Sequence, residues 1–367
     1  MKSLSLKLFI IALIICLVGV VSIYSSTFQK EGSAWQDIFK RQLLWLFIGI
    51  VLFFLASNLN YRRLWDATYI LYGAALFLLL LVFILGIVRL GAQRWLRIAW
   101  FNFQPSEIVK LIMVIFFARY FSKKASGDAS FAASRYGITQ ALIIPFLFLI
   151  IPMGLIIEQP DLGSGILVFL IFIAMLFFSA AKLRYILLLL IVSLSSLPVF
   201  WHFLKDYQRE RLMVFLNPNM DPLGAGYTII QSRIAIGSGG LIGQGWLAGT
   251  QSQLHFLPES HTDFIFATFA EQWGWLGSIA LLLLYYFLIR TGFQIASRTH
   301  DYFGRLMALG ISVMLAIQVY INIAMNMGLA PVVGVPLPLM SYGGSSMAVT
   351  FVALGILASI DRERSVF

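Results

Sequence analysis

The chain alternates long apolar runs with short polar turns. About ten of these runs approach the length of roughly 20 residues that an α-helix needs to cross a bilayer. They cover residues 8–25, 43–59, 67–88, 105–121, 139–157, 163–181, 185–204, 263–288, 304–327 and 345–360. This pattern predicts an all-α, polytopic integral membrane protein whose residues 1–367 form a single transmembrane domain.

The composition excludes an ordinary soluble domain. Hydrophobic residues make up 60% of the chain and charged residues 11%, so the apolar side chains exceed what one soluble core can bury. A net charge of +10 would suggest nucleic-acid binding in a soluble protein. Here the Lys and Arg residues lie mostly in turns between apolar runs, so we expect contact with a membrane and no nucleic acid. Cys16, the single cysteine, rules out a disulfide framework.

The basic residues also predict the orientation in the membrane. With the amino terminus in the cytoplasm, 15 of the 26 Lys and Arg residues fall in inner turns, ten in outer turns and one within a helix. Four of the outer ten lie in one long loop, where the positive-inside rule has little weight. We therefore expect an uncleaved first helix and both termini in the cytoplasm, which puts the polar segments on the extracytoplasmic side.

One of these outer segments is a loop of about 60 residues, from about residue 205 to residue 262. Loops of this length usually have a function or contain structure of their own. The stretch YTIIQSRIAIG places apolar residues at helical spacing and predicts a helix lying on the membrane surface. The following GSGGLIGQG, from Gly237, fits either a tight turn or a loop whose N–H groups bind phosphate.

Three charged residues lie near the outer ends of predicted helices. Glu107 and Lys110 are three residues apart on one helical face, so they can form an ion pair that braces the bundle, or Lys110 can contact a phosphate or base. Asp161 follows a proline at a helix start. A helix N-cap and a role in a functional site explain this aspartate equally well.

Asp263 has the same ambiguity, because it lies where the polar run LPESHT meets an apolar helix. It can cap that helix or act as a base at the membrane surface. Glu259 and His261 lie within four residues of it, and His261 alone is most simply a hydrogen-bonding boundary residue. The long loop places four cations opposite this cluster: Lys205, Arg209, Arg211 and Arg233.

Five strings, in this order, resemble the SEDS family (shape, elongation, division and sporulation): QPSEIVKL, QPDLGSG, GAGYTIIQSRIAIGSGGLIGQG, FLPESHTDFIFA and PLPLMSYGGSS. The resemblance covers essentially the whole chain. DPLGAGY and GTQSQLHFLPESHTDFIF are more similar to the elongation-type members than to the division-type members. The departures, such as Gln93 and Met340, touch no charged position.

The resemblance implies a peptidoglycan glycosyltransferase that polymerises lipid II at the outer face of the bacterial cytoplasmic membrane during cell elongation. It also implies a partner, a class B penicillin-binding protein that acts as transpeptidase on the growing undecaprenyl-linked glycan. Asp263 matches the acid of the HTDFIF string, which the resemblance implies is essential. Other matches to the family strings are Glu107, Lys110, Asp161, Arg94 and Trp95.

This activity suggests a role for each charge. We expect Asp263 to be the general base that deprotonates the acceptor hydroxyl, with inversion at the donor sugar and release of undecaprenyl diphosphate. Lys110, Arg94 and Arg211 are candidates for the diphosphate, together with Mg²⁺ or Mn²⁺. The alternatives are a flippase or transporter of lipid-linked precursors, the division-type paralogue, or a membrane scaffold without catalytic activity.

Overall fold

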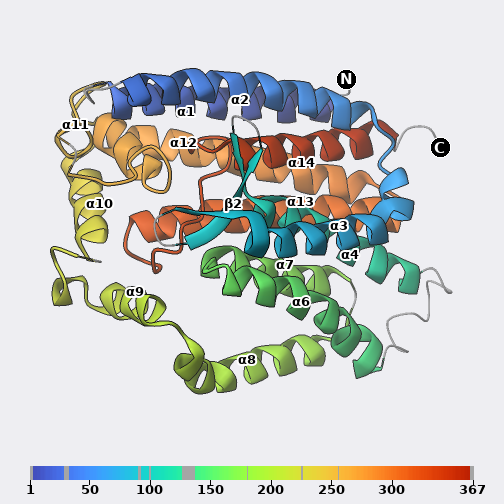
Figure 1. The fold of residues 1–367 in the computed structure, drawn as a ribbon. Coiled ribbons are helices and arrows are strands. Elements are labelled where there is room, and N and C mark those ends of the chain that lie inside the picture. The colour runs from blue at the N-terminus through green and yellow to red at the C-terminus, as the bar shows by residue number, and fades with distance from the viewer. Residues whose placement is uncertain are drawn as a thin grey trace.

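The computed structural model describes residues 3–28, 33–89, 92–98, 101–125, 137–179, 181–224, 226–254 and 256–363. Long helices run side by side in one bundle, and shorter helices cross one end of it (Figure 1). The bundle helices are α1 (Ser3–Thr27), α2 (Ser33–Asn58), α3 (Arg63–Leu85), α4 (Pro105–Ala125), α6 (Ile144–Glu158), α7 (Leu162–Phe178), α8 (Leu183–Phe203), α12 (Ile265–Arg298), α13 (Tyr302–Asn326) and α14 (Gly344–Glu363). A π-helical segment, η1 (Thr139–Ile143), leads into α6.

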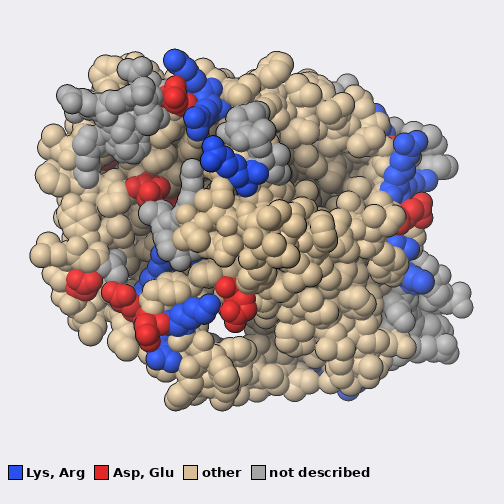
Figure 2. Space-filling model, in the orientation of Figure 1, with Lys and Arg blue, Asp and Glu red and all other residues tan. Residues whose placement is uncertain are grey.

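These helices confirm the predicted polytopic membrane fold. Among the described residues, seven helices are long and apolar enough to cross a membrane: α1, α2, α3, η1 with α6, α12, α13 and α14. The shorter apolar helices α7 and α8, and α4 with its charged residues, bring the bundle to the ten helices that the sequence predicts. Figure 2 shows charged side chains gathered toward the two ends of the bundle, with a wide uncharged surface between them.

The helix bounds differ from the apolar runs where polar residues extend a helix beyond the hydrocarbon layer. α2 begins at Ser33, ten residues before the predicted start, and α12 continues to Arg298, ten residues past the predicted end. α13 and α14 form the centre of the bundle, since 72% and 83% of their apolar windows are buried, compared with 28% for α2 and α3. The outer helices therefore present most of their apolar surface to lipid.

The first and last helices meet at one end of the bundle. α1 begins and α14 ends at the right in Figure 1. The backbone N–H and the hydroxyl of Ser5 both donate to Asp361 Oδ2, at 3.2 and 2.7 Å. The two ends of the chain therefore approach the same face of the membrane. Four cations that entered the orientation count lie outside the described residues: Lys2, Lys30, Arg135 and Arg364.

The long loop lies at the opposite end of the bundle and contains four helical segments. They are α9 (Asp206–Leu216), the 3₁₀ helix η2 (Pro218–Met220), α10 (Tyr227–Ser238) and α11 (Thr250–Gln253). α10 covers the stretch expected to be a surface helix and runs across the direction of the bundle (Figure 1). Its buried face is Ile229, Ser232 and Ala235, while Ile234 is exposed.

A small antiparallel sheet between α3 and α4 is the one architectural feature that the all-α prediction missed. It contains β1 (Gly86–Arg89), β2 (Ala92–Ile98) and β3 (Phe101–Phe103) in the order β1-β2-β3. The Gln93 amide fixes β2 to the end of α3, because it donates to the carbonyl oxygens of Val82 and Gly86 at 3.0 Å each. The register skips Arg94, which is the extra residue of a β-bulge.

The glycine cluster after α10 packs against a kink in α12. Trp275 donates its backbone N–H to Gly240 O at 2.9 Å, and Gln244 donates to Glu271 O at 3.0 Å. The backbone N–H groups of Gly243 and Gly245 are also hydrogen-bonded within this contact. These groups are therefore engaged by protein, which favours the tight-turn interpretation over a phosphate-binding loop.

Gly274, at the kink, is a position that only glycine suits. Its φ of 63° and ψ of −160° are reached almost only by glycine, and a Cβ there would lie 2.3 Å from Gly243 N. We expect Gly274→Ala to lower the free energy of unfolding by about 1–3 kcal/mol, measured as thermal unfolding in detergent.

Gly73→Ala is the matched control, because this residue lies on the exposed face of α3 with open space where a Cβ would be. Its stability should stay the same or rise slightly, since alanine is the better helix former. Equal melting temperatures for wild type and Gly274→Ala would show that the kink does not hold the loop in place.

Candidate active site

Asp263 lies in a tight turn directly before α12, at the end of the bundle that the long loop covers. Glu259 begins this turn with a left-handed φ of 49°. Its carbonyl oxygen accepts the backbone N–H groups of Thr262 at 3.1 Å and Phe264 at 3.3 Å. The polar run predicted to mark the membrane boundary therefore folds back on itself and presents Asp263 at the helix start.

The Asp263 carboxylate does not cap the helix. Phe264 is the N-cap residue, and no side chain caps at that position. Across the part of the chain that the structure describes, the carboxylate makes no hydrogen bond and no ion pair. Gly334 lies beside it, since a Cβ on this glycine would be 3.6 Å from Asp263 Oδ2. Asp263 therefore does not cap α12.

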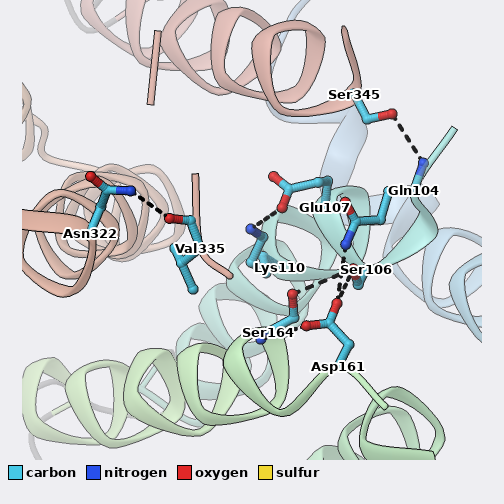
Figure 3. A network of polar contacts seen from close by, with 9 residues as sticks. All are labelled: Gln104, Ser106, Glu107, Lys110, Asp161, Ser164, Asn322, Val335 and Ser345. Carbon is cyan, nitrogen blue, oxygen red and sulfur yellow. Dashed lines mark hydrogen bonds and ion pairs between the residues drawn. The ribbon is translucent and has the colours of Figure 1, made fainter. Parts of the chain in front are cut away.

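The backbone of Asp263, in contrast, is held firmly by α13. The side-chain amides of Asn322 and Asn326 both donate to its carbonyl oxygen, at 3.0 and 2.9 Å. Asn322 also donates to Val335 O at 2.8 Å (Figure 3). Both asparagines are fully buried. The sequence analysis missed them, although two amides four residues apart in an apolar span are a usable signal.

The surroundings of Asp263 make it a stronger base than an ordinary aspartate. Burial, together with the negative charges of Glu259 and Asp161, raises the pKa of Asp263 from 3.8 to about 6, against the opposing charges of Arg211 and Arg94. The side chain keeps partial access to solvent. With this pKa the carboxylate is roughly nine-tenths ionised at pH 7 and can still accept a proton.

A pocket at this end of the bundle brings the two arginines together. It is lined by Arg94, Leu162, Arg211 and Val333, with other residues of α9 and of the segment before α14. Arg211 projects from α9 and donates to Val332 O at 3.2 Å. Both arginines act on the charge of Asp263, and Gly334 beside the carboxylate follows Val333 of the lining, so the pocket lies at the same end of the bundle as Asp263.

Arg94 is directed by its β-bulge toward the turn between α6 and α7. Its guanidinium donates to Gln159 O at 3.2 Å and to Pro160 O. Bulges commonly re-aim a side chain beside an active site. Its neighbour Trp95 is half-buried and pairs with Ile87 of β1.

Asp161 is the N-cap of α7 and the acceptor of a buried network. Its carboxylate accepts the backbone N–H of Ser164 at 3.2 Å, the hydroxyl of Ser106 at 2.9 Å and the amide of Gln104 at 3.1 Å (Figure 3). Gln104 donates its own backbone N–H to the Ser345 hydroxyl at 3.0 Å. The capping interpretation therefore holds for Asp161, which also ties together the starts of α4, α7 and α14.

Glu107 and Lys110 form the expected ion pair inside the bundle. Lys110 Nζ lies 2.6 Å from Glu107 Oε1, and the side chains are 1% and 3% exposed. Figure 3 shows this pair between the Asp161 network and the contact of Asn322 with Val335. Because each charge compensates the other, this pair within α4 lets both groups stay buried in the bundle.

The remaining predicted site residues lie in the Asp263 turn and in the long loop. His261 is buried, with its ring 5.8 Å from that of Tyr342, and its carbonyl oxygen accepts the Tyr342 N–H at 2.9 Å. Glu259 is exposed and accepts the Thr262 hydroxyl at 3.0 Å. Two loop cations make ion pairs of their own: Lys205 with Glu158 and Arg209 with Asp206.

The described residues contain no group of three or more His, Cys, Asp or Glu side chains that could hold a metal ion. Glu259 and Asp263 are two carboxylates of one turn, which by themselves do not complete a coordination shell. The donor set of the protein therefore does not by itself fit a resident Mg²⁺ or Mn²⁺.

The fold and the site define a polytopic membrane protein with a weakly acidic carboxylate and two arginines at one end of its bundle. The sequence profile of the FtsW, RodA and SpoVE family, described as "Cell cycle protein", matches residues 5–366. The chain belongs to this family, as its motifs indicate. It is a glycosyltransferase, in agreement with the names of its relatives MrdB and FtsW.

The relatives include proteins named MrdB, stage V sporulation protein E and FtsW. The chain is 42% identical to peptidoglycan glycosyltransferase MrdB of Escherichia coli K12, over 97% of this chain and 92% of that one. It is 39% identical to stage V sporulation protein E of Bacillus subtilis 168, over 97% and 96%. Identity to an FtsW protein of Geobacter sulfurreducens is 35%, over 97% and 94%.

Solved structures agree with this assignment. A chain from a peptidoglycan synthase complex that coordinates polymerization and crosslinking is 34% identical, with a TM-score of 0.79 over 98% of this chain and 97% of that chain. The rod shape determining protein RodA of Thermus thermophilus is 29% identical, with a TM-score of 0.71 over 98% and 96%. The expected similarity to elongation-type members is confirmed.

The buried pair offers a test that separates bracing from substrate contact. We expect Glu107→Gln to lower the free energy of unfolding by about 3–5 kcal/mol, because it leaves the Lys110 ammonium buried without a counter-charge. The double variant Glu107→Gln/Lys110→Met should regain most of that stability, measured by thermal unfolding. If the single variant melts like the wild type, the pair does not brace the bundle.

Proposed function

We propose that this protein polymerises lipid II into glycan strands at the outer face of the bacterial cytoplasmic membrane during cell elongation, with Asp263 as general base. The observation that carries the proposal is the Asp263 carboxylate: it makes no hydrogen bond to the start of α12, and its pKa is raised to about 6. Two arginines that act on this carboxylate line a pocket at the same end of the bundle. These are the requirements for transfer of a sugar from a diphosphate donor.

Asp263 has one task in this reaction. The acceptor hydroxyl is a poor nucleophile, so the carboxylate takes its proton as the new glycosidic bond forms. The bond from the donor sugar to the undecaprenyl diphosphate breaks in the same displacement, and its electron pair leaves with the diphosphate. An α-linked donor then gives a β-linked product, with inversion and without a covalent enzyme intermediate.

The arginines of the pocket receive the leaving group. Arg94 and Arg211 offer fixed, permanently charged donors that suit a diphosphate. Lys110 is fully buried and engaged by Glu107, so we assign it to the bracing of the bundle. We propose that Mg²⁺ or Mn²⁺, where the reaction uses one, enters bound to the substrate diphosphate and adds further neutralisation of charge.

The orientation and the partner complete the proposal. Both termini lie in the cytoplasm, as the excess of basic residues in the inner turns supports, which puts Asp263 outside. A similar chain belongs to a synthase complex in which polymerization and crosslinking are coordinated. We propose that this chain likewise works with a class B penicillin-binding protein as transpeptidase on the undecaprenyl-linked glycan.

Two competing functions are less well supported. Transporters and flippases usually place their ionisable sites near the bilayer midplane, whereas Asp263, Arg94 and Arg211 lie at the end of the bundle that the long loop covers. The division-type role of the same family is disfavoured by the lower identity to the FtsW protein than to MrdB.

Asp263→Asn tests the general base. With the transpeptidase partner present, polymerisation of purified lipid II should fall about 10²- to 10⁴-fold, because the amide cannot accept the proton. Asp206→Asn is the matched control, since this carboxylate on α9 is exposed and pairs only with its neighbour Arg209. Wild-type polymerisation by Asp263→Asn would rule out this role, and lipid translocation without polymer would support the transporter.

The raised pKa predicts an acid limit of activity. Because Asp263 works as the ionised form, kcat/KM should fall tenfold per pH unit below an apparent pKa of about 6 and be level above it. Glu259→Gln removes a negative charge that raises this pKa, so its acid limb should move to lower pH. Activity that stays constant down to about pH 4.5 would contradict the assignment.

A further inference from the structure

The start of α12 is capped from a neighbouring helix. The Asn326 side-chain oxygen accepts the backbone N–H of Ala267 at 3.2 Å. This N–H is the third of α12 and one of the group that has no partner within the helix itself. The same amide of Asn326 donates through its nitrogen to Asp263 O at 2.9 Å. One side chain of α13 thus holds both the turn and the helix that follows it.

An N-cap side chain normally accepts the N–H of the second or third helical residue. In this turn Phe264 is at the N-cap position and supplies no such acceptor. Asp263 is the nearest acidic residue in sequence, and carboxylates are among the preferred caps. A carboxylate that accepts helix N–H groups is stabilised as the anion, which makes it a weaker base. When another group accepts the Ala267 N–H, the Asp263 carboxylate is not needed as a cap and stays the stronger base.

We propose that Asn326 is a positioning residue that caps α12 in place of Asp263 and so keeps the Asp263 carboxylate available as a base. This inference rests on the proposed role of Asp263 as general base. Asn322 accepts no N–H of α12: its amide donates to Asp263 O at 3.0 Å and to Val335 O at 2.8 Å, and its side-chain oxygen accepts the Asn326 amide at 3.3 Å. The two asparagines thus form a natural pair of test and control.

Other charged groups also act on Asp263 and set the baseline for any pH measurement. They are Glu259 in the same turn, Arg211 on α9, Arg94 on β2 and Asp161 at the start of α7. Asn326 is uncharged, so its replacement leaves all four in place. A shift of the pH profile in an Asn326 variant then reports the contacts of the Asp263 carboxylate and no change of net charge.

The experiment measures the pH dependence of lipid II polymerisation by the full-length chain with its transpeptidase partner. In Asn326→Ala the Ala267 N–H loses its acceptor and competes for the Asp263 carboxylate. We expect kcat near neutral pH to fall about tenfold and the acid limb of kcat/KM to move down by at least about half a pH unit. KM for lipid II should stay within about twofold, because the substrate contacts remain.

Asn322→Ala should lower kcat and leave the acid limb in place, since Asn326 still caps α12. An Asn326→Ala protein with the wild-type rate and acid limb would overturn the inference, as would equal shifts in the two variants. If Asn326→Ala does not fold, Asn326→Ser replaces it, because the serine hydroxyl is too short to reach Ala267 N and the same criteria apply. Asp263→Asn in the same assay separates the positioning role of Asn326 from the general-base role of Asp263. Activity retained in Asp263→Asn would contradict the general base itself.

Discussion

The chemistry at the end of this bundle depends on how one backbone carbonyl is held. Two buried amides of α13 donate to Asp263 O, at 3.0 and 2.9 Å. They fix the position of the residue without using its carboxylate. An aspartate at a helix start would normally be drawn into capping and become a weaker base. The Asn326 oxygen instead accepts the Ala267 N–H of α12, which leaves the Asp263 side chain uncapped.

The surrounding charges then adjust the pKa of the Asp263 carboxylate. The backbone of this residue is held in place, and among the described residues its side chain makes no hydrogen bond. Desolvation and the charges of Glu259 and Asp161 raise its pKa, the charges of Arg211 and Arg94 lower it, and the resulting pKa is about 6. The arginines therefore have two effects: they line the pocket that we propose for the anionic leaving group, and their charges lower the pKa of Asp263. The buried network of Asp161 ties the starts of α4, α7 and α14 together.

Much of this arrangement can be predicted from the sequence, and the rest depends on contacts between distant segments. Apolar runs of spanning length predict the bundle, and the position of Asp263 at a polarity boundary marks the site. The family strings, more than the spacing, favoured Asp263 as base over cap. Spacing could not show that Asn326 would cap α12, because residues 326 and 267 meet only through the packing of α12 on α13. The bulge that directs Arg94 is likewise a property of strand pairing.

We propose that Asp263 titrates above an ordinary aspartate because its half-buried carboxylate is desolvated and makes no hydrogen bond to the helix it precedes. Its titration can be measured directly by carbodiimide modification of the intact protein across a pH series, with the labelled peptide quantified by mass spectrometry. We expect the protonated, reactive carboxyl to disappear with a midpoint near pH 6. A midpoint near 4 or lower would show an ordinary or capping aspartate and contradict the role of Asp263 as an uncapped base.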